Sequence, residues 1–173
     1  MKRVDDRLAY STDSRRQMSN SKNKSSKQNT RILIVDDHPL VRLSLREFIR
    51  RESDLEVCGE AEDRDEALAC VAATKPHLAI IDLTLKNSNG LELIKDLRER
   101  YPEVKILVLS MHDEILHAER AVRAGARGYI TKQEATTKIM VAIRQVLAGE
   151  IYHWHRNDQN CDRLDFRIRA EHR

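Results

Sequence analysis

From residue 31 onward, short apolar runs alternate with segments of helical periodicity. The runs 32–35 and 78–81 are continuously apolar, which predicts strands covered on both faces. In residues 55–61, apolar and polar residues alternate only loosely, which predicts a more exposed strand. Five strands are predicted in all, at residues 32–35, 55–61, 78–81, 104–109 and 128–131.

A helical pattern follows each predicted strand. Pro39 can open the first helix, because a proline in the first turn loses no intrahelical hydrogen bond. Pro102 and Gly149 end two later helices. After the helix that opens at Pro39, the others are predicted at 64–74, 90–101, 113–126 and 135–149. The apolar residues predicted to face inward are Val41, Leu45, Phe48, Ile49, Leu93, Ile94, Leu97, Ile139, Ala142, Ile143 and Val146.

Five strand–helix units within roughly 120 residues predict an α/β fold. Connections of this kind are right-handed crossovers. The strands should therefore form a parallel sheet with helices on both faces, a doubly wound arrangement. We expect this domain to occupy residues 31–152.

The net charge of the 173-residue chain, +3, is unevenly distributed. Residues 1–30 hold eight Lys and Arg against three Asp and Glu, and residues 153–173 hold five against four, which leaves −3 for residues 31–152. The predicted domain is mildly acidic, so the pI of about 8.8 does not indicate a nucleic-acid-binding surface on it. Residues 11–30 are almost all polar, and we expect 1–30 to be a disordered basic tail.

The three cysteines, Cys58, Cys70 and Cys161, are odd in number and form no Cys-x-x-Cys pair, which favours a reduced compartment. No apolar run approaches the length of a membrane span, and the N-terminus has no apolar signal core. These features predict a soluble cytoplasmic protein with no membrane partner.

Four of the five predicted strands end in polar residues that can take part in chemistry. In open α/β sheets, ligands bind beyond the carboxyl ends of the strands. We therefore expect these residues to converge on one rim of the sheet. They are Asp36 and Asp37 after the first strand, Asp82 after the third, Ser110 after the fourth, and Thr131 and Lys132 at the end of the fifth.

Each of these residues also has a plain structural interpretation. Asp82 can mark the exit of a strand into water, Asp37 can cap the following helix, and Lys132 can be a solvated loop lysine. Their joint occurrence at the strand ends is harder to explain in this way and favours a common site.

The residue types at this rim suit magnesium-assisted phosphoryl transfer. Several carboxylates together repel one another and need a cation, and oxygen ligands with several waters suit Mg²⁺. A carboxylate beside Mg²⁺ can attack phosphorus and form an aspartyl phosphate. The Lys132 ammonium and the Ser110 hydroxyl can supply further charge neutralisation.

The motifs ILIVDDHPLVR, IIDLTLKNSNGLELI, VLSMHDE and GYITK, in this order, resemble the receiver domain of bacterial two-component response regulators. The DDHP entry, the LSMHDE segment and the AGEIY end of the last helix are most similar to the NarL/FixJ (LuxR-type) subfamily. The resemblance covers residues 31–152. It implies a flavodoxin-like (βα)5 fold with strand order 2-1-3-4-5.

The resemblance also implies a role for each residue of the rim. Tyr129 stands at the position of the family's switch aromatic, which turns inward when the switch hydroxyl engages phosphate; the plain alternative is a half-buried aromatic on an edge strand. The implied roles are Asp82 as phosphoacceptor, Asp37 as direct Mg²⁺ ligand, Asp36 as Mg²⁺ ligand through water, the Thr84 carbonyl as the remaining metal ligand, Ser110 as switch hydroxyl and Lys132 as phosphate-binding group.

A sensor histidine kinase is the partner that the resemblance implies. Phosphorylation would switch the surface of residues 113–131 and can promote a homodimer. The domain would be no enzyme beyond its own phosphorylation and dephosphorylation at Asp82. Two positions depart from the family pattern, because Lys86 and Gln133 stand where the family often has proline. Without proline, a cis bond after Lys132 would cost several kcal/mol.

Members of this subfamily usually continue into a helix-turn-helix domain, whereas residues 153–173 are too short and too polar to fold alone. We interpret them as a linker remnant and expect no sequence-specific DNA binding from this chain alone. The alternative function is a transcription regulator whose DNA-binding output is truncated or supplied by another chain. The tail also contains four possible metal ligands, but their spacing matches no zinc-finger pattern: His153, His155, Cys161 and His172.

Two further classes of protein fit less well. A Mg²⁺-dependent phosphatase that forms an aspartyl phosphate usually needs a second Asp two residues after the nucleophile, where Thr84 stands. A flavin-binding protein of similar topology needs a Gly/Ser/Thr phosphate loop after the first strand, where DDHP stands.

Overall fold

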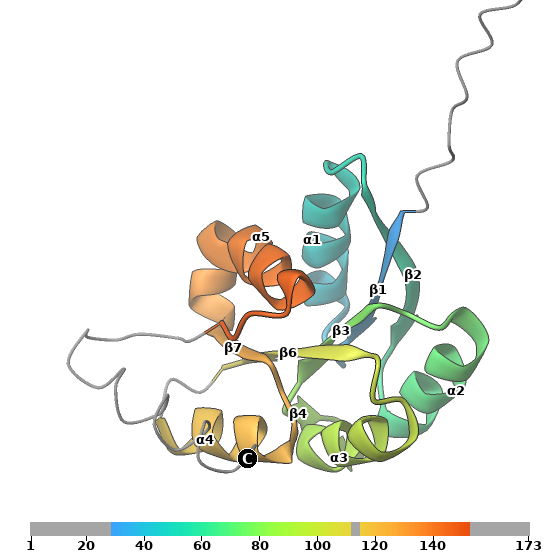
Figure 1. Ribbon diagram of the computed structural model, residues 1–173, viewed down its shortest axis with the longest axis vertical. Helices are drawn as coiled ribbons and strands as arrows, with labels where there is room; N and C mark the ends of the chain where they lie inside the picture. Colours follow the sequence, from blue (N-terminus) through green and yellow to red (C-terminus); the bar gives the residue numbers. More distant parts are fainter. Residues whose placement is uncertain (1–28, 112–114, 153–173) are drawn as a thin grey trace, which may run out of the picture.

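The computed structural model describes residues 29–111 and 115–152, and Figure 1 shows their arrangement. Five parallel strands form one sheet in the order β2-β1-β3-β6-β7. This is the predicted flavodoxin-like order, and it puts β3 at the centre of the sheet. The strands are β1 (Thr30–Val35), β2 (Leu55–Ala61), β3 (Leu78–Asp82), β6 (Lys105–Ser110) and β7 (Gly128–Thr131).

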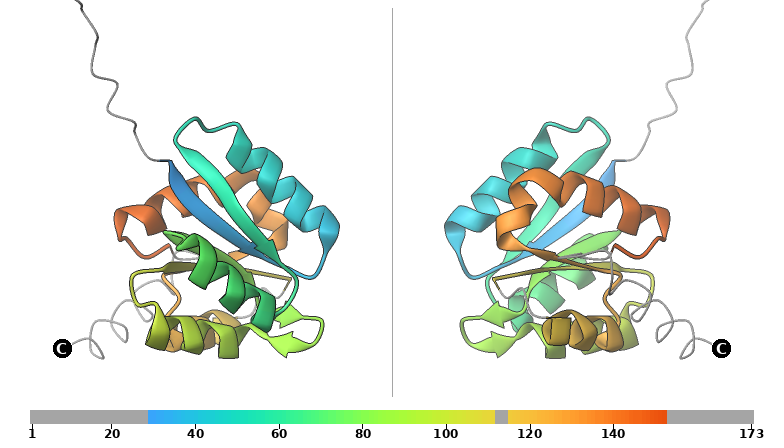
Figure 2. Two further views of the ribbon diagram at one scale, coloured as in Figure 1. Left: turned by 90° about the vertical axis from the view of Figure 1, so that its right-hand side faces the viewer. Right: turned by 90° about the vertical axis from the view of Figure 1, so that its left-hand side faces the viewer.

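Helices cover both faces of the sheet, as predicted. Figure 2 shows α1 and α5 on one side of the sheet and α2, α3 and α4 on the other. The helices are α1 (Pro39–Arg50), α2 (Arg64–Thr74), α3 (Gly90–Arg100), α4 (Ile115–Ala124) and α5 (Lys132–Ala148). The predictions for the tails, apart from Asn29 and Thr30, lie outside the described residues.

One difference from prediction concerns the start of α5, which begins at Lys132 instead of residue 135. Thr131 is the N-cap of this helix: its hydroxyl accepts a hydrogen bond from the Glu134 backbone N–H and donates one to the Glu134 carboxylate. Threonine followed three residues later by glutamate is the capping-box sequence. The cap places Lys132 on the first turn of a helix instead of in a loop.

A second difference concerns the polar loop after β3. It contains a small antiparallel hairpin of β4 (Thr84–Leu85) and β5 (Ser88–Asn89). Strands of two residues are too short to show an alternating pattern, so the sequence does not predict them. The hairpin gives the chain that leaves β3 a defined course into α3.

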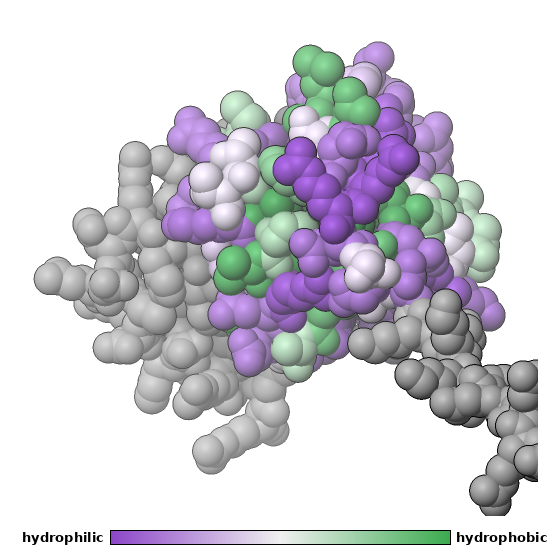
Figure 3. Space-filling model, turned by 90° about the horizontal axis from the view of Figure 1, so that it is seen from above, coloured by the Kyte–Doolittle hydropathy of each residue, from purple (hydrophilic) through white to green (hydrophobic). Residues whose placement is uncertain are grey.

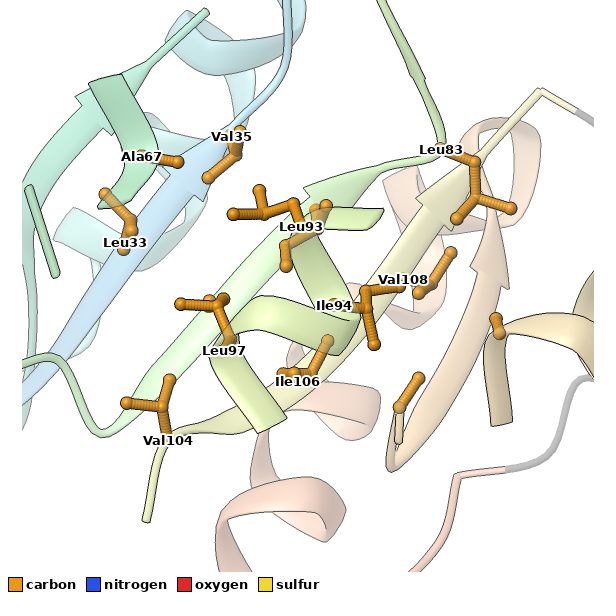
Figure 4. Close-up of a cluster of buried hydrophobic side chains, with 14 of the residues drawn as sticks. Leu33, Val35, Ala67, Leu83, Leu93, Ile94, Leu97, Val104, Ile106 and Val108 are labelled. Carbon is orange, nitrogen blue, oxygen red and sulfur yellow. The ribbon is translucent and has the colours of Figure 1, made fainter. Parts of the chain in front are cut away.

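The core beneath α3 consists of closely packed aliphatic side chains. Ile94 and Leu97 of α3 lie near Ile106 and Val108 of β6, and Leu93 points toward β1 in the same cluster (Figure 4). All five are at most 1% exposed, which confirms the predicted inward face of α3. Full burial of such a side chain stabilises a fold by about 1.5–3 kcal/mol. This packing holds the strands, and with them the rim, in fixed positions.

The opposite core, beneath α1 and α5, is buried as predicted except near the rim. Val41 and Phe48 are only partly buried, because they line an open groove of about 210 Å³ between the two helices. Lys132 also lines this groove. The fully buried residues of the predicted inward faces are Leu45, Ile49, Ile139, Ala142, Ile143 and Val146.

Polar side chains predominate on one face of the domain. The face in Figure 3 is mostly hydrophilic, with smaller hydrophobic areas between the polar side chains. None of the helices in the described ranges has the length and apolar character needed to cross a membrane. Among the described residues, the large apolar side chains that are exposed are Leu40, Leu43, Met111, Leu116 and Val141.

Candidate functional site

The carboxyl ends of β1, β3, β6 and β7 meet at one rim of the sheet. Because β1 and β3 are neighbours in parallel register, Asp36 and Asp82 leave the sheet side by side. In β6 and β7, Ser110 lies opposite Thr131, one residue before Lys132. The register of the parallel strands thus brings residues from distant parts of the chain together.

Lys132 bridges two of the buried acids. Its Nζ lies 2.7 Å from Asp36 Oδ2 and 2.7 Å from Asp82 Oδ2. The Lys132 side chain is 9% exposed and the two carboxylates are 1% and 2% exposed, so the interpretation of Lys132 as a solvated loop lysine is wrong. Burial lowers the pKa of the Lys132 ammonium, but its contacts with both carboxylates outweigh burial and raise that pKa. The lysine therefore stays charged.

Two donors hold the Asp82 carboxylate in one orientation. The Thr84 backbone N–H donates to Oδ1 at 3.1 Å, and Lys132 Nζ donates to Oδ2 at 2.7 Å. Burial raises the pKa of Asp82; the two donors lower it without cancelling the rise, and the charge of Asp36 raises it further. Asp82 does not mark an exit into water. It is a fixed and poorly solvated carboxylate, which suits a nucleophile.

The third acid, Asp37, faces a histidine. His38 Nδ1 lies 2.7 Å from Asp37 Oδ1 and 3.3 Å from Asp36 Oδ1. His38 is the N-cap residue of α1, and its side chain makes no capping hydrogen bond. The prediction that Asp37 caps this helix is therefore wrong. One ligand atom from each of Asp36, Asp37, His38 and Asp82 lies within 4.8 Å of the others.

Arg42 of α1, the last residue of the motif ILIVDDHPLVR, also belongs to this site, although the motif implies no role for it. One guanidinium nitrogen donates to the Asp36 carbonyl at 2.6 Å, and another donates to the Glu62 carboxylate at 2.6 Å. Its Nε lies 3.4 Å from Glu60 Oε2, and the side chain is 12% exposed. Arg42 ties the end of β1 to β2. The available signal is its position four residues after His38, on the same side of the helix.

The backbone around Asp82 depends on a close approach of α3. A Cβ atom at Gly90 would lie 2.2 Å from the Asp82 carbonyl oxygen and 2.7 Å from Leu83 Cα. Only glycine permits this approach. The Asn89 side chain accepts a hydrogen bond from the Leu91 N–H and caps α3 directly beside this contact.

Ser110 lies at the rim, at the end of β6, and Tyr129 lies on the neighbouring β7, two residues before that strand ends. They are 0% and 2% exposed. Tyr129 belongs to the apolar cluster on the side of α3 and α4, so the alternative of a half-buried edge-strand aromatic is wrong. Thr84 is exposed and contributes its backbone N–H to Asp82.

The two departures from the family pattern leave this geometry intact. Lys86 is exposed in the turn between β4 and β5. No peptide bond within the described residues is cis, so the bond between Lys132 and Gln133 is trans. The lysine nevertheless reaches both carboxylates.

The arrangement suits a divalent cation. Three carboxylates share the rim, but the Lys132 ammonium contacts only those of Asp36 and Asp82, and such a group of like charges favours a further positive charge. Asp36 Oδ2 and Asp37 Oδ1 are buried and accept no well-oriented hydrogen bond within the described ranges, although each lies 2.7 Å from a basic nitrogen. Mg²⁺ takes oxygen ligands of this kind, usually one or two carboxylates together with waters. The donor set therefore fits Mg²⁺.

Comparison with known proteins explains this set of residues. Residues 32–144 match the response regulator receiver domain family. The chain belongs to this family. A receiver domain of a two-component response regulator implies a cognate histidine kinase and is generally not a true enzyme. The pocket of Asp36, Asp37 and Asp82 fits its phosphorylation site, and the acidic cluster is typical of its magnesium site.

Relatives of this receiver domain include transcription regulators. The chain is 39% identical over 121 residues to the transcriptional activator protein ExaE of Pseudomonas putida, covering 70% of this chain and 56% of that protein. It is 34% identical over 121 residues to the transcriptional regulatory protein DegU of Brevibacillus brevis, covering 70% of this chain and 51% of that protein. The chain thus spans little more than half the length of these curated relatives.

Solved structures show the same fold. A LuxR-family two-component response regulator from Aurantimonas sp. SI85-9A1 superimposes with a TM-score of 0.70 at 32% identity, covering 84% of this chain and 99% of the other. The signal receiver domain of the putative response regulator NarL from Mycobacterium tuberculosis superimposes with a TM-score of 0.67 at 28% identity, covering 71% of this chain and 99% of the other. These similarities agree with the NarL/FixJ type that the motifs indicate.

Proposed function

We propose that Asp82 is the phosphoacceptor of a two-component phosphorelay and receives its phosphoryl group from a phosphohistidine of a sensor histidine kinase. The observation that supports this best is the buried Asp82 carboxylate, fixed between the Thr84 N–H and the Lys132 ammonium. Family membership supports the kind of donor. The kinase and the receiver would meet in the bacterial cytoplasm.

In the proposed transfer, a carboxylate oxygen of Asp82 forms a bond to phosphorus while the bond from phosphorus to the histidine nitrogen breaks. The nitrogen leaves with the electron pair of that bond. Lys132 already lies beside the carboxylate and would move its ammonium onto the phosphate oxygens. Ser110, at the end of the adjacent strand, would donate its hydroxyl to the same phosphate. Phosphoryl transfer depends mainly on such positioning and charge neutralisation.

In this proposal, Asp37 and Asp82 bind Mg²⁺ directly, together with the Thr84 carbonyl, while Asp36 binds it through water. Bound Mg²⁺ supplies charge neutralisation for the transferred phosphoryl group. The two buried carboxylate oxygens without well-oriented hydrogen bonds, on Asp36 and Asp37, support this assignment. Lys132 would give up its contact with Asp36 when the cation takes over that role.

The test is phosphorylation by a small donor. The chain is incubated with acetyl phosphate and Mg²⁺, and intact mass is measured for one added phosphoryl group. Asp82→Asn should remove the added mass, while Asp65→Asn, an exposed acid of α2, should leave it unchanged. Borohydride reduction followed by peptide mapping locates the acyl phosphate. Unchanged labelling of Asp82→Asn would assign the phosphoacceptor elsewhere.

We further propose that phosphorylation switches the surface of residues 113–131. Ser110 and Tyr129 lie on neighbouring strands, and the inward, buried position of Tyr129 supports a link between the rim and that surface. The test is hydrogen exchange of β7 with and without phosphodonor. A change in the wild-type chain that is absent in Asp82→Asn is expected, and sedimentation would show whether a homodimer forms at the same time.

A second candidate function is control of transcription through a DNA-binding output that another chain supplies. The regulators that it resembles are transcription regulators of nearly twice the matched length. The receiver alone would then bind no promoter DNA specifically. A gel shift with promoter fragments tests this, and specific binding by the chain alone would contradict it.

A further inference from the structure

We propose that His38 turns the cation site of this receiver into a mixed oxygen and nitrogen site that prefers divalent transition ions of the Mn²⁺ to Zn²⁺ series to Mg²⁺. The imidazole Nδ1 would be a metal ligand beside the Asp37 carboxylate. The proposal rests on the cation site proposed above and specifies which ions it selects.

The distances at the rim allow a shared ion. His38 Nδ1 lies 2.7 Å from Asp37 Oδ1 and 3.3 Å from Asp36 Oδ1, and the four possible ligand atoms, including one of Asp82, lie within 4.8 Å of one another. Nitrogen and oxygen ligands lie about 2.0–2.2 Å from Zn²⁺, so two ligands of one ion are at most about 4.4 Å apart. A small inward movement of the side chains would complete such a site.

The backbone presents the imidazole to the acids before any ion binds. His38 is the N-cap of α1 with φ −91° and ψ 110°, an extended conformation that the following Pro39 favours. Its backbone N–H donates to Asp36 Oδ1 at 2.8 Å. The ring therefore starts beside the carboxylates. Because the His38 side chain is 61% exposed, an ion arriving from solvent reaches it without unfolding the rim.

The chemistry of the ligands then separates the two kinds of ion. Mg²⁺ takes oxygen ligands and retains its waters, so it gains little from an imidazole. Ions of the Mn²⁺ to Zn²⁺ series accept imidazole nitrogen readily, with affinities that rise toward the end of the series. A metal ion binds imidazole nitrogen only where that nitrogen carries no proton. His38 should therefore strengthen transition-ion binding far more than Mg²⁺ binding.

The test compares two ions on one set of variants. The full chain is titrated with Co²⁺, followed by visible absorption, and separately with Mg²⁺, followed by calorimetry. His38→Asn should weaken Co²⁺ binding about tenfold or more, in the range typical for groups that support a metal site, and should change the Co²⁺ spectrum. Mg²⁺ affinity should change by a much smaller factor. Equal changes for both ions, or an unaltered Co²⁺ affinity, would overturn the proposal.

Two control variants locate the signal. His77→Gln removes a histidine at the opposite end of the strands, where His77 Nδ1 accepts a hydrogen bond from the Arg31 N–H, and should leave both titrations unchanged. Asp37→Asn should abolish the part of the Co²⁺ absorption that His38→Asn also removes. If Asp37→Asn and His38→Asn both leave the Co²⁺ absorption of the wild-type chain unchanged, the Co²⁺ binds elsewhere in the chain and the proposed site is contradicted.

The outcome is independent of the phosphorylation test. If the wild-type chain with Mg²⁺ fails to label at Asp82 while His38→Asn selectively weakens Co²⁺ binding, the phosphoacceptor assignment is wrong and the metal preference holds. If labelling succeeds but the two ions respond alike to His38→Asn, the metal preference is wrong and the phosphoacceptor assignment holds.

Discussion

Replacing Lys132 with methionine should destabilise the domain strongly, because it leaves two buried acids facing each other. The substitution removes Nζ contacts of 2.7 Å to both Asp36 and Asp82, whose side chains are 1% and 2% exposed. Removing one partner of a buried ion pair typically costs about 3–5 kcal/mol. Since the pKa of Asp82 is already raised by burial, this acid can take up a proton and relieve part of the repulsion. We therefore expect the free energy of unfolding at pH 7 to fall by about 3 kcal/mol, near the lower end of this range.

The loss should depend on pH in a defined direction. Without the ammonium, the pKa of Asp82 should rise further, because its charged form then faces the Asp36 carboxylate in a buried site with no cation beside it. The folded variant therefore binds protons more tightly than the unfolded chain does. The loss in its free energy of unfolding relative to wild type should be greatest at neutral pH. This loss should shrink as the pH falls toward the ordinary pKa range of carboxyl groups.

Urea unfolding followed by far-UV circular dichroism in EDTA measures this loss. Lys138→Met is the matched control, because Lys138 lies on the same helix, is 52% exposed and pairs with Glu134 at 2.9 Å. Exposed pairs contribute only about 0.5 kcal/mol. Adding Asp82→Asn to Lys132→Met should restore part of the stability, since the repulsion between the two acids is removed while the buried Asp36 carboxylate still lacks the Lys132 ammonium. A loss equal to that of Lys138→Met, or no rescue by Asp82→Asn, would refute the reasoning.

Three further predictions concern neighbouring residues. Asp82→Asn should raise the free energy of unfolding at pH 7 in EDTA. Burial raises the pKa of Asp82 above the ordinary carboxyl pKa of 3.8, so at higher pH the charged form disfavours the fold. The gain in stability should therefore vanish as the pH falls to about 4. Urea unfolding between acid and neutral pH checks this, and a gain independent of pH would contradict it. Gly90→Ala should cost about 2–3 kcal/mol, because its Cβ would lie 2.2 Å from the Asp82 carbonyl oxygen and the backbone must move. Gly149→Ala, with open space but φ +90°, should cost only about 1–2 kcal/mol; equal urea midpoints for the two variants would argue against the contact. Arg42→Met should weaken Mg²⁺ binding about tenfold through loss of the 2.6 Å hydrogen bond to the Asp36 carbonyl, with partial recovery in Arg42→Lys; unchanged affinity by calorimetry would exclude a positioning role.

Local signals in the sequence predict most of the elements. β2 and α2 have the bounds that the sequence predicts, at residues 55–61 and 64–74. In the structure, Asp63 is the N-cap of α2 and accepts a hydrogen bond from the Glu66 N–H. The earlier start of α5 has a local signal too, in the Thr131 and Glu134 cap. By contrast, the hairpin of β4 and β5 has too few residues for any periodicity.

The burial of individual residues is less predictable. Tyr129 lies on an edge strand, where half of the side chain would ordinarily meet water, but it is 2% exposed because it packs into the cluster on the side of α3 and α4. Arg42 has the pattern of a surface residue on a polar helix face. Its contacts with the Asp36 carbonyl and Glu62 arise only when β1, β2 and α1 are placed together.

The sequence by itself determines which groups reach the rim, because residues at strand ends in a parallel sheet must emerge on the same edge. It therefore supplies Asp36, Asp37, Asp82, Ser110 and Lys132 as candidates. The tertiary structure decides how these groups affect one another.

Lys132 and Asp82 are 50 positions apart in the chain, yet their charged atoms lie 2.7 Å apart, and their side chains are only 9% and 2% exposed. Coulomb energy and desolvation depend on distance and burial, which residue spacing does not encode. For this reason, only the folded sheet decides that Asp82 is a desolvated and oriented carboxylate rather than an acid at the exit of a strand.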